Sequence, residues 1–103
     1  RVYRASDERE HAEWLADLES AADRLDLGSA ARSRARDVFL SAVPEADGSK
    51  QTVLAASLYV GALVAGEERS QGAVADATGV SRLAVQQRWK DLLETAGLDA
   101  PDW

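Results

Sequence analysis

Apolar residues recur at helical spacing along most of the 103-residue chain. Positions three and four residues apart share one face of an α-helix, so such a stripe predicts an amphipathic helix. The first stripe follows a capping box of Asp7 and Glu10, and Gly28 is expected to end its helix. Ser29 can cap a second helix, which Pro44 closes. The side chains predicted to face inward are Trp14, Leu15, Leu18, Ala21, Ala22 and Leu25 on the first helix, and Ala31, Ala35, Val38, Phe39 and Ala42 on the second.

The third segment differs because residues 52–65 carry no charge at all. A helix that is apolar on every side is buried on every side, so this segment predicts the central helix of the core. Its length and its content of Ala and Leu argue against a strand. Gly66 supplies the left-handed residue that ends the helix.

Two shorter helices are predicted next. Ser70 caps a fourth helix ending near Thr78, and Ser81 caps a fifth that runs to about Ala96. With no strand pattern anywhere, the chain predicts an all-α bundle of five helices. We expect one domain over residues 1–98, followed by a short tail over 99–103, in which Pro101 excludes a helix.

The spacing within residues 71–90 is typical of a helix-turn-helix. Ala75 is small where the two helices would cross most closely, and Gly79 permits a left-handed turn between them. The side chains expected to fill their shared core are Val74, Val80, Val85 and Trp89.

Helical geometry then predicts the exposed face of the fifth helix. If Val85, Trp89, Leu92 and Ala96 are buried, a rotation of about 100° per residue places Leu83, Gln87 and Lys90 opposite, with Gln86 beside them and Arg82 at the N-terminal end. Glutamine suits adenine, arginine suits guanine, and leucine can contact the thymine methyl. The alternative is an ordinary solvated face with one exposed leucine.

Charge is unevenly distributed along the chain. Eighteen acidic and twelve basic residues give a net charge of −6, so the whole molecule is not a polycation. Residues 5–27 are strongly acidic, which indicates either a solvated face or a surface that repels DNA, whereas residues 81–90 carry three bases and no acid. Arg32, Arg34 and Arg36 form a second basic stretch. The chain has only two lysines but many carboxylates, and this composition favours adaptation to high salt.

Composition excludes several function classes. The chain has no Cys for a zinc ribbon or a Cys-ligated cluster, and no apolar run approaches the roughly 20 residues of a membrane span. His11 is the only histidine, and no phosphate-binding glycine pattern or metal-ligand spacing is present. We therefore expect a cytoplasmic protein that is not an enzyme and uses no cofactor, metal, membrane or small-molecule substrate.

Residues 51–60 (Gln-Thr-Val-Leu-Ala-Ala-Ser-Leu-Tyr-Val) and 66–71 (Gly-Glu-Glu-Arg-Ser-Gln) resemble the cyclin-like repeat of archaeal transcription initiation factor B, the relative of eukaryotic factor IIB. Residues 74–92, from Val74-Ala75 through Gly79-Val80-Ser81 to Asp91-Leu92, resemble the end of the second repeat in that family. The resemblance is close over 50–92 and loose over 7–97, and the acidic composition suggests a haloarchaeal source.

This resemblance implies a five-helix cyclin fold whose helix-turn-helix reads a promoter element in the major groove, beside the TATA-binding protein. It places Ser81, Arg82, Leu83, Gln86, Gln87 and Lys90 at the reading positions. Ser70 and Gln71 would lie near a phosphate, because N–H groups at a helix start bind anions. Arg88 and Lys90 would add phosphate contacts. Double-stranded DNA is thus the implied partner, with the TATA-binding protein, RNA polymerase components or a second copy of the chain beside it.

The chain also departs from the family. It has neither the cysteines of the zinc ribbon nor a second repeat, and Gln86 and Gln87 stand where the family usually has a basic residue and Asn. It is either a fragment of a full factor or a single-repeat relative, and the span of the chain around one repeat slightly favours the latter. A rival hypothesis is a cyclin-fold module that binds a protein partner, with Leu83 and Trp103 as contact residues.

Overall fold

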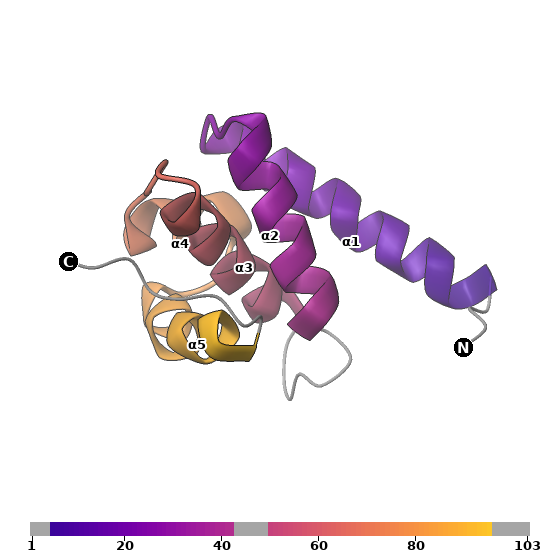
Figure 1. Cartoon of the computed structure of the whole chain (residues 1–103). Coiled ribbons are helices and arrows are strands. Elements are labelled where there is room, and N and C mark those ends of the chain that lie inside the picture. The colour runs from indigo at the N-terminus through magenta and orange to yellow at the C-terminus, as the bar shows by residue number, and fades with distance from the viewer. Residues whose placement is uncertain (1–4, 43–49, 96–103) are drawn as a thin grey trace.

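The computed structural model describes the backbone of residues 5–42 and 50–95 and the side chains of 12–42 and 50–94. The described residues form five helices and no strand, which confirms the predicted all-α, cyclin-like bundle (Figure 1). The helices are α1 (Ala5–Arg24), α2 (Ser29–Ala42), α3 (Lys50–Val64), α4 (Gln71–Thr78) and α5 (Arg82–Thr95). None of them is long and apolar enough to cross a membrane.

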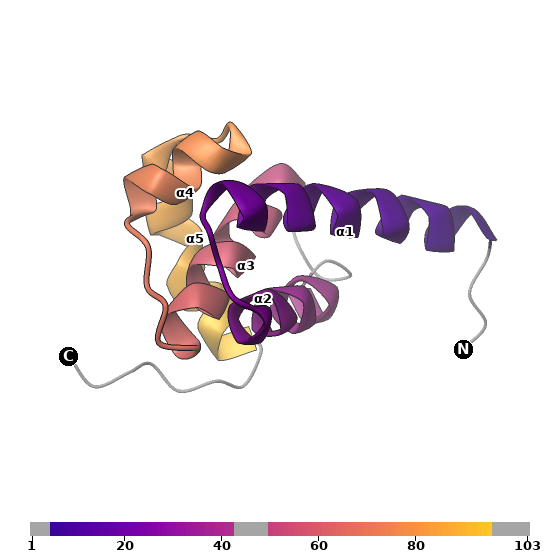
Figure 2. The same ribbon diagram turned by 90° about the horizontal axis from the view of Figure 1, so that it is seen from above.

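Helix α3 is the centre of the bundle, as its uncharged sequence predicts. All residues from Val53 to Leu63 are buried, and α3 contacts each of the other four helices. Seen from above, α3 lies between α1 and α2 on one side and α5 on the other (Figure 2). Helix α3 approaches α2 closely at Gly61, where a Cβ atom would lie 2.6 Å from the backbone nitrogen of Ala35 on α2. Glycine at this position therefore lets two helix backbones touch.

The inward-facing residues predicted on the first two helices are confirmed. All those named on α2 are buried, as are Leu18, Ala21 and Ala22 on α1 and Leu25 directly after it. Trp14 and Leu15 are partly buried against the same core, and the Trp14 ring lies 6.4 Å from that of Phe39. Leu27 and Leu93 are also buried, although the helical stripes do not single them out.

The predicted ends of α1 are wrong at both termini. The helix begins at Ala5, so Asp7 and Glu10 lie inside it rather than at its start; alanine, the strongest helix former, extends the first turn. At the other end the left-handed residue is Asp26, with φ 55°, and not Gly28. The Leu27 N–H donates to the Ala22 carbonyl (3.1 Å) and the Asp26 N–H to that of Asp23 (3.1 Å), which is the Schellman pattern. Aspartate tolerates this conformation better than most residues.

Of the remaining turn predictions, those at Gly66 and Gly79 are confirmed, the cap at Ser29 is wrong, and the others are untested. Gly66 and Gly79 both have positive φ, 79° and 77°, as predicted. Ser29 is the first residue of α2 rather than the residue before it, and the Gly28 carbonyl accepts from Arg32 N–H at 3.2 Å. Pro44, Ala96, Pro101, Trp103 and the boundary between residues 98 and 99 lie outside the described residues.

Candidate nucleic-acid interface

Helices α4 and α5 form the predicted helix-turn-helix, and each is capped by the predicted serine. Ser70 Oγ accepts a hydrogen bond from Ala73 N–H at 3.0 Å, and Ser81 Oγ accepts one from Ala84 N–H at 3.1 Å. Gly79 ends α4 in the left-handed region, and its N–H donates to the Ala75 carbonyl at 2.9 Å. Three residues thus connect two helices, and in each helix a serine side chain accepts from one N–H group of the first turn.

The C-terminal end of α4 is held by side chains from two other helices. Arg24 Nη1 on α1 donates to the Ala77 carbonyl at 3.0 Å, and Gln51 Nε2 on α3 donates to the Thr78 carbonyl. The last carbonyls of a helix have no partner within it, so these donors supply what the helix lacks. Both contacts join residues far apart in the sequence, and periodicity gave no sign of them.

The N-terminal approach to α4 is anchored to the loop between α1 and α2. The Arg69 guanidinium donates to the carbonyls of Leu25 (2.8 Å) and Asp26 (3.1 Å). Glu67 Oε1 accepts from the Gly28 N–H at 2.8 Å, and a Cβ on Gly28 would lie only 3.0 Å from the Glu67 carboxylate. Gly28 therefore provides room for this contact. These contacts of residues 66–69 with the loop after α1 fix the position of α4.

The exposed face of α5 agrees with the prediction. Five side chains on this face are exposed to solvent, and they are spaced one residue or about one helical turn apart: Arg82, Leu83, Gln86, Gln87 and Lys90. Leu83 is 59% exposed, the most of any large apolar residue that the structure describes. Val85, Trp89 and Leu92 are buried, and Arg88 is half-buried. Lys90 Nζ lies 5.6 Å from the centroid of the Trp89 ring, a cation–π distance.

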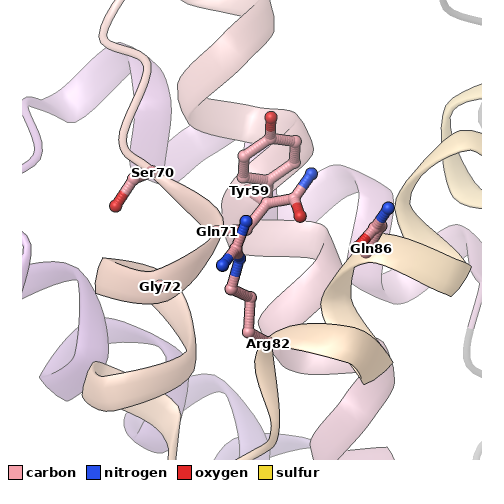
Figure 3. Close-up of a pocket in the computed structure, with 6 residues that line it drawn as sticks. All are labelled: Tyr59, Ser70, Gln71, Gly72, Arg82 and Gln86. Carbon is pink, nitrogen blue, oxygen red and sulfur yellow. The ribbon is translucent and has the colours of Figure 1, made fainter.

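Four of the predicted contact residues lie around one concavity of about 570 Å³ at the N-terminal ends of α4 and α5. Its lining consists of Tyr59, Ser70, Gln71, Gly72, Arg82 and Gln86 (Figure 3). The other predicted residues do not line it: Ser81, Leu83, Gln87, Arg88 and Lys90. Sequence reasoning missed Tyr59 and Gly72. Tyr59 lies in the uncharged, buried run of α3 and so carries no sign of a site, whereas a glycine in the first turn of a short helix is a usable signal.

The predicted second basic stretch is largely neutralised by α1. Arg32 Nη1 lies 3.1 Å from Glu19 and 2.6 Å from Asp23, and Arg36 Nη2 lies 3.0 Å from Glu19. Hydrogen bonds from Arg32 and Arg36 lower the pKa of Glu19, and those to Asp23 and Glu19 raise the pKa of Arg32. Part of the acidic helix thus serves as the ion-pair partner of α2, which neither interpretation of its charge anticipated. Arg82 has no such partner within the described part of the chain.

No group of His, Cys, Asp or Glu side chains among the described residues could hold a metal ion. What the helix-turn-helix offers is instead an exposed helix face with amide, guanidinium and ammonium groups, next to a concavity at a helix start. Such groups donate hydrogen bonds to phosphate oxygens and to base edges.

Comparison with known proteins agrees with this geometry. Residues 8–95 match the family model described as "Transcription factor TFIIB repeat". The chain is 33% identical over 82 residues to transcription initiation factor IIB 2 of Thermococcus kodakarensis, covering 77% of this chain and 27% of that protein. It is 34% identical over 83 residues to transcription initiation factor IIB of Pyrococcus abyssi, covering 78% and 28%.

A shorter match, 40% identical over 47 residues, links the chain to transcription initiation factor IIB of Archaeoglobus fulgidus and covers 46% of this chain and 14% of that protein. The chain spans roughly a quarter of the length of the first two relatives, whose organisms are archaea as the resemblance implied. The family match, in contrast, extends over all five helices. This chain is a member of the transcription factor TFIIB repeat family.

Proposed function

We propose that this domain acts in transcription initiation by binding duplex promoter DNA through its helix-turn-helix. The observation that carries the proposal is the exposed face of α5, where the side chains of Gln86, Gln87 and Leu83 are open to solvent. Both ends of α4 and the start of α5 are held by hydrogen bonds, so the face is presented by a rigid element. Rigid presentation lowers the entropy lost on binding.

The residues divide into two roles. Gln86 and Gln87 donate to and accept from base edges in the major groove, and Leu83 contacts a thymine methyl. Arg88 and Lys90 contact phosphates and fix the register of the helix on the duplex. A single module buries about 600–1,000 Å² on DNA, so tight binding requires a second copy or a protein such as the TATA-binding protein on the same site.

The test is selection of a binding site from a randomised duplex pool, followed by anisotropy titration of the selected and a scrambled duplex in stepped KCl. Gln86→Ala with Gln87→Ala removes base contacts, and we expect about 1–3 kcal/mol of discrimination to be lost per contact while binding to the scrambled duplex is kept. Lys90→Ala is expected to weaken binding to both duplexes equally and to lower the salt slope by about 1. No selected motif, from a protein folded by circular dichroism, refutes the proposal.

A second candidate function is supported by Leu83, whose exposure suits a protein contact better than open solvent. The net charge of −6 also favours a protein partner over DNA. In this function the domain binds a component of the transcription machinery, such as the TATA-binding protein or RNA polymerase, through the face around Leu83. Leu83→Asp would then abolish the interaction in pull-down with the purified component, whereas the two glutamine substitutions would leave it intact.

A further inference from the structure

The C-terminal end of α4 borders a second concavity, of about 240 Å³, where α1, α3 and α4 meet. Seen from above, the end of α1 lies beside α4 (Figure 2). The two donors that cap α4 line this concavity, Arg24 on α1 and Gln51 on α3. Their acceptors are the carbonyl groups of Ala77 and Thr78, which line it too. On this side, α4 is therefore held by hydrogen bonds at the rim of an open space.

Arg24 is placed to act on α4. Among the residues that the structure describes, its guanidinium makes one hydrogen bond, to the Ala77 carbonyl at 3.0 Å, and no ion pair. A hydrogen bond from a charged donor is roughly twice as strong as a neutral one, so Arg24 is the stronger of the two caps. The next two carbonyls of the chain, those of Leu25 and Asp26, accept from Arg69 just before α4. The end of α1 thus holds both the approach to α4 and its last turn.

The turn after α4 connects the position of this helix to that of α5. Gly79 is in the left-handed region and Ser81 caps α5, and both turn residues are held by hydrogen bonds. The first two residues of α5, Arg82 and Leu83, are exposed, and the first buried side chain of this helix is that of Val85. The first turn of α5 therefore buries no side chain fully in the core, and its position depends on the end of α4.

A small tilt of α5 is enough to move its exposed face. The ring of Trp89 is buried against Tyr59 at 5.3 Å and anchors the middle of the helix. With a rise of 1.5 Å per residue, Leu83 lies about 9 Å and Gln86 about 4.5 Å along the helix from Trp89. A tilt of about 7° about Trp89 shifts the backbone by about 1 Å at Leu83 and by about 0.5 Å at Gln86. Binding groups need to be held within about 0.5 Å of their productive geometry, so such a tilt weakens base contacts.

We propose that Arg24, although it lies outside the helix-turn-helix, is a positioning residue for base readout. Its hydrogen bond to the Ala77 carbonyl sets the tilt of the first turns of α5, and thereby the positions of Leu83 and Gln86 in the major groove. Arg24 itself contacts no DNA. This inference rests on the proposed function, because it names what aligns the exposed face of α5 with the bases.

Arg24→Met tests the proposal, because methionine keeps an apolar stem and removes the donor. Arg36→Met is the matched control, since it makes the same chemical change and also removes a single hydrogen bond of 3.0 Å. That bond joins Arg36 to Glu19, between α2 and α1, and does not involve α4. Both variants lose one positive charge. Each is titrated by anisotropy against the selected and the scrambled duplex in stepped KCl, and circular dichroism gives its melting temperature.

We expect the preference of Arg24→Met for the selected over the scrambled duplex to fall about tenfold below that of Arg36→Met, the loss of one base contact. Binding to the scrambled duplex is expected to be equal in the two variants, because the phosphate contacts remain. The slope of log K against log salt is expected to be equal as well. An unchanged preference overturns the proposal. A slope lowered by about 0.9 relative to the control also overturns it, because that result identifies Arg24 as a phosphate contact.

A double-mutant cycle with Gln86→Ala separates positioning from a general effect on the fold. If Arg24 acts through Gln86, Arg24→Met costs little further preference once Gln86 is alanine, whereas independent effects multiply. We expect the tenfold loss to shrink to about threefold or less in the Gln86→Ala protein, and full multiplication overturns the proposal. Arg24→Gln, whose shorter side chain cannot reach the Ala77 carbonyl, replaces Arg24→Met in both assays if that variant is unfolded at the assay temperature.

The failures of the two proposals are distinguishable. If the wild type selects a motif and Arg24→Met keeps its preference, the positioning role is wrong and the proposed function stands. If the wild type binds no duplex, the proposed function fails, and NMR decides whether Arg24 positions α5. Residual dipolar couplings of the amides of residues 82–86 that change relative to those of α3 in Arg24→Met, but not in Arg36→Met, support the positioning of α5. Unchanged couplings refute it.

Discussion

Among the glycines that the structure describes, Gly61 is the one at which an added methyl group is expected to lower the free energy of unfolding most. A Cβ on Gly61 would lie 2.6 Å from the backbone nitrogen of Ala35, 2.7 Å from its Cα and 2.8 Å from the Ala31 carbonyl oxygen. All three are backbone atoms of α2, which cannot rotate aside as the end of a side chain can. Gly61→Ala therefore forces α2 and α3 apart along their crossing.

The magnitude follows from two opposing effects. Overpacking a well-filled core costs about 1–3 kcal/mol, and three backbone contacts point to the upper end of that range. Alanine regains about 1 kcal/mol in helix propensity over glycine. We expect a net loss of about 2 kcal/mol in the free energy of unfolding, which lowers the melting temperature by about 8–16 °C for a domain of this size.

Urea denaturation followed by circular dichroism measures this loss, as a midpoint lower by about 1 M. Gly72→Ala is the matched control, because it makes the same chemical change in open space and is expected to gain up to about 1 kcal/mol. A Gly61→Ala protein as stable as the wild type, with an unchanged m-value, would refute the close approach of α2 and α3.

Two further predictions concern the contacts made by α1 and the loop after it. Arg69→Met is expected to lower the free energy of unfolding by about 2 kcal/mol in the same urea assay, because it leaves the Leu25 and Asp26 carbonyls without their charged donor; a change below about 0.5 kcal/mol would contradict this. Hydrogen bonds from Arg32 and Arg36 hold the pKa of Glu19 below its usual value of 4.5, so their stabilisation is complete above that pH and is lost as the pH falls through the lower folded value. Glu19→Gln is expected to flatten the loss of stability between neutral and acid pH, and an unchanged pH profile would argue against the ion pairs.

Much of the fold was predictable because its signals are local or periodic. The uncharged run over 52–65 has no place in a small bundle except the centre, and α3 lies there. The caps at Ser70 and Ser81 and the left-handed turn at Gly79 depend on neighbouring residues alone, and each was found at the predicted position. The exposed face of α5 followed from helical geometry once Val85 and Trp89 were placed in the core.

The contacts that hold α4 and the segment before it in place could not be predicted, because they join polar atoms of residues far apart in the sequence. Arg24 meets the Ala77 carbonyl across 53 positions, and Gly28 meets Glu67 across 39. A charged side chain that bonds to a backbone carbonyl or N–H group leaves no periodic trace in the sequence, and the same residue types occur at solvated positions. Gly28 was misread for this reason, since its use lies in admitting Glu67 and not in ending α1.

The attachment of α4 at both ends has a consequence for how the domain folds. Helices below about 12–15 residues are marginal in isolation, and α4 has eight. Its ends are fastened by Arg24 on α1, by Gln51 on α3 and by the loop that Arg69 ties to the end of α1. We therefore expect α4, the element that precedes α5, to form only after the C-terminal turns of α1 have docked. In hydrogen exchange its amides should open together with the C-terminal turns of α1, as one cooperative unit.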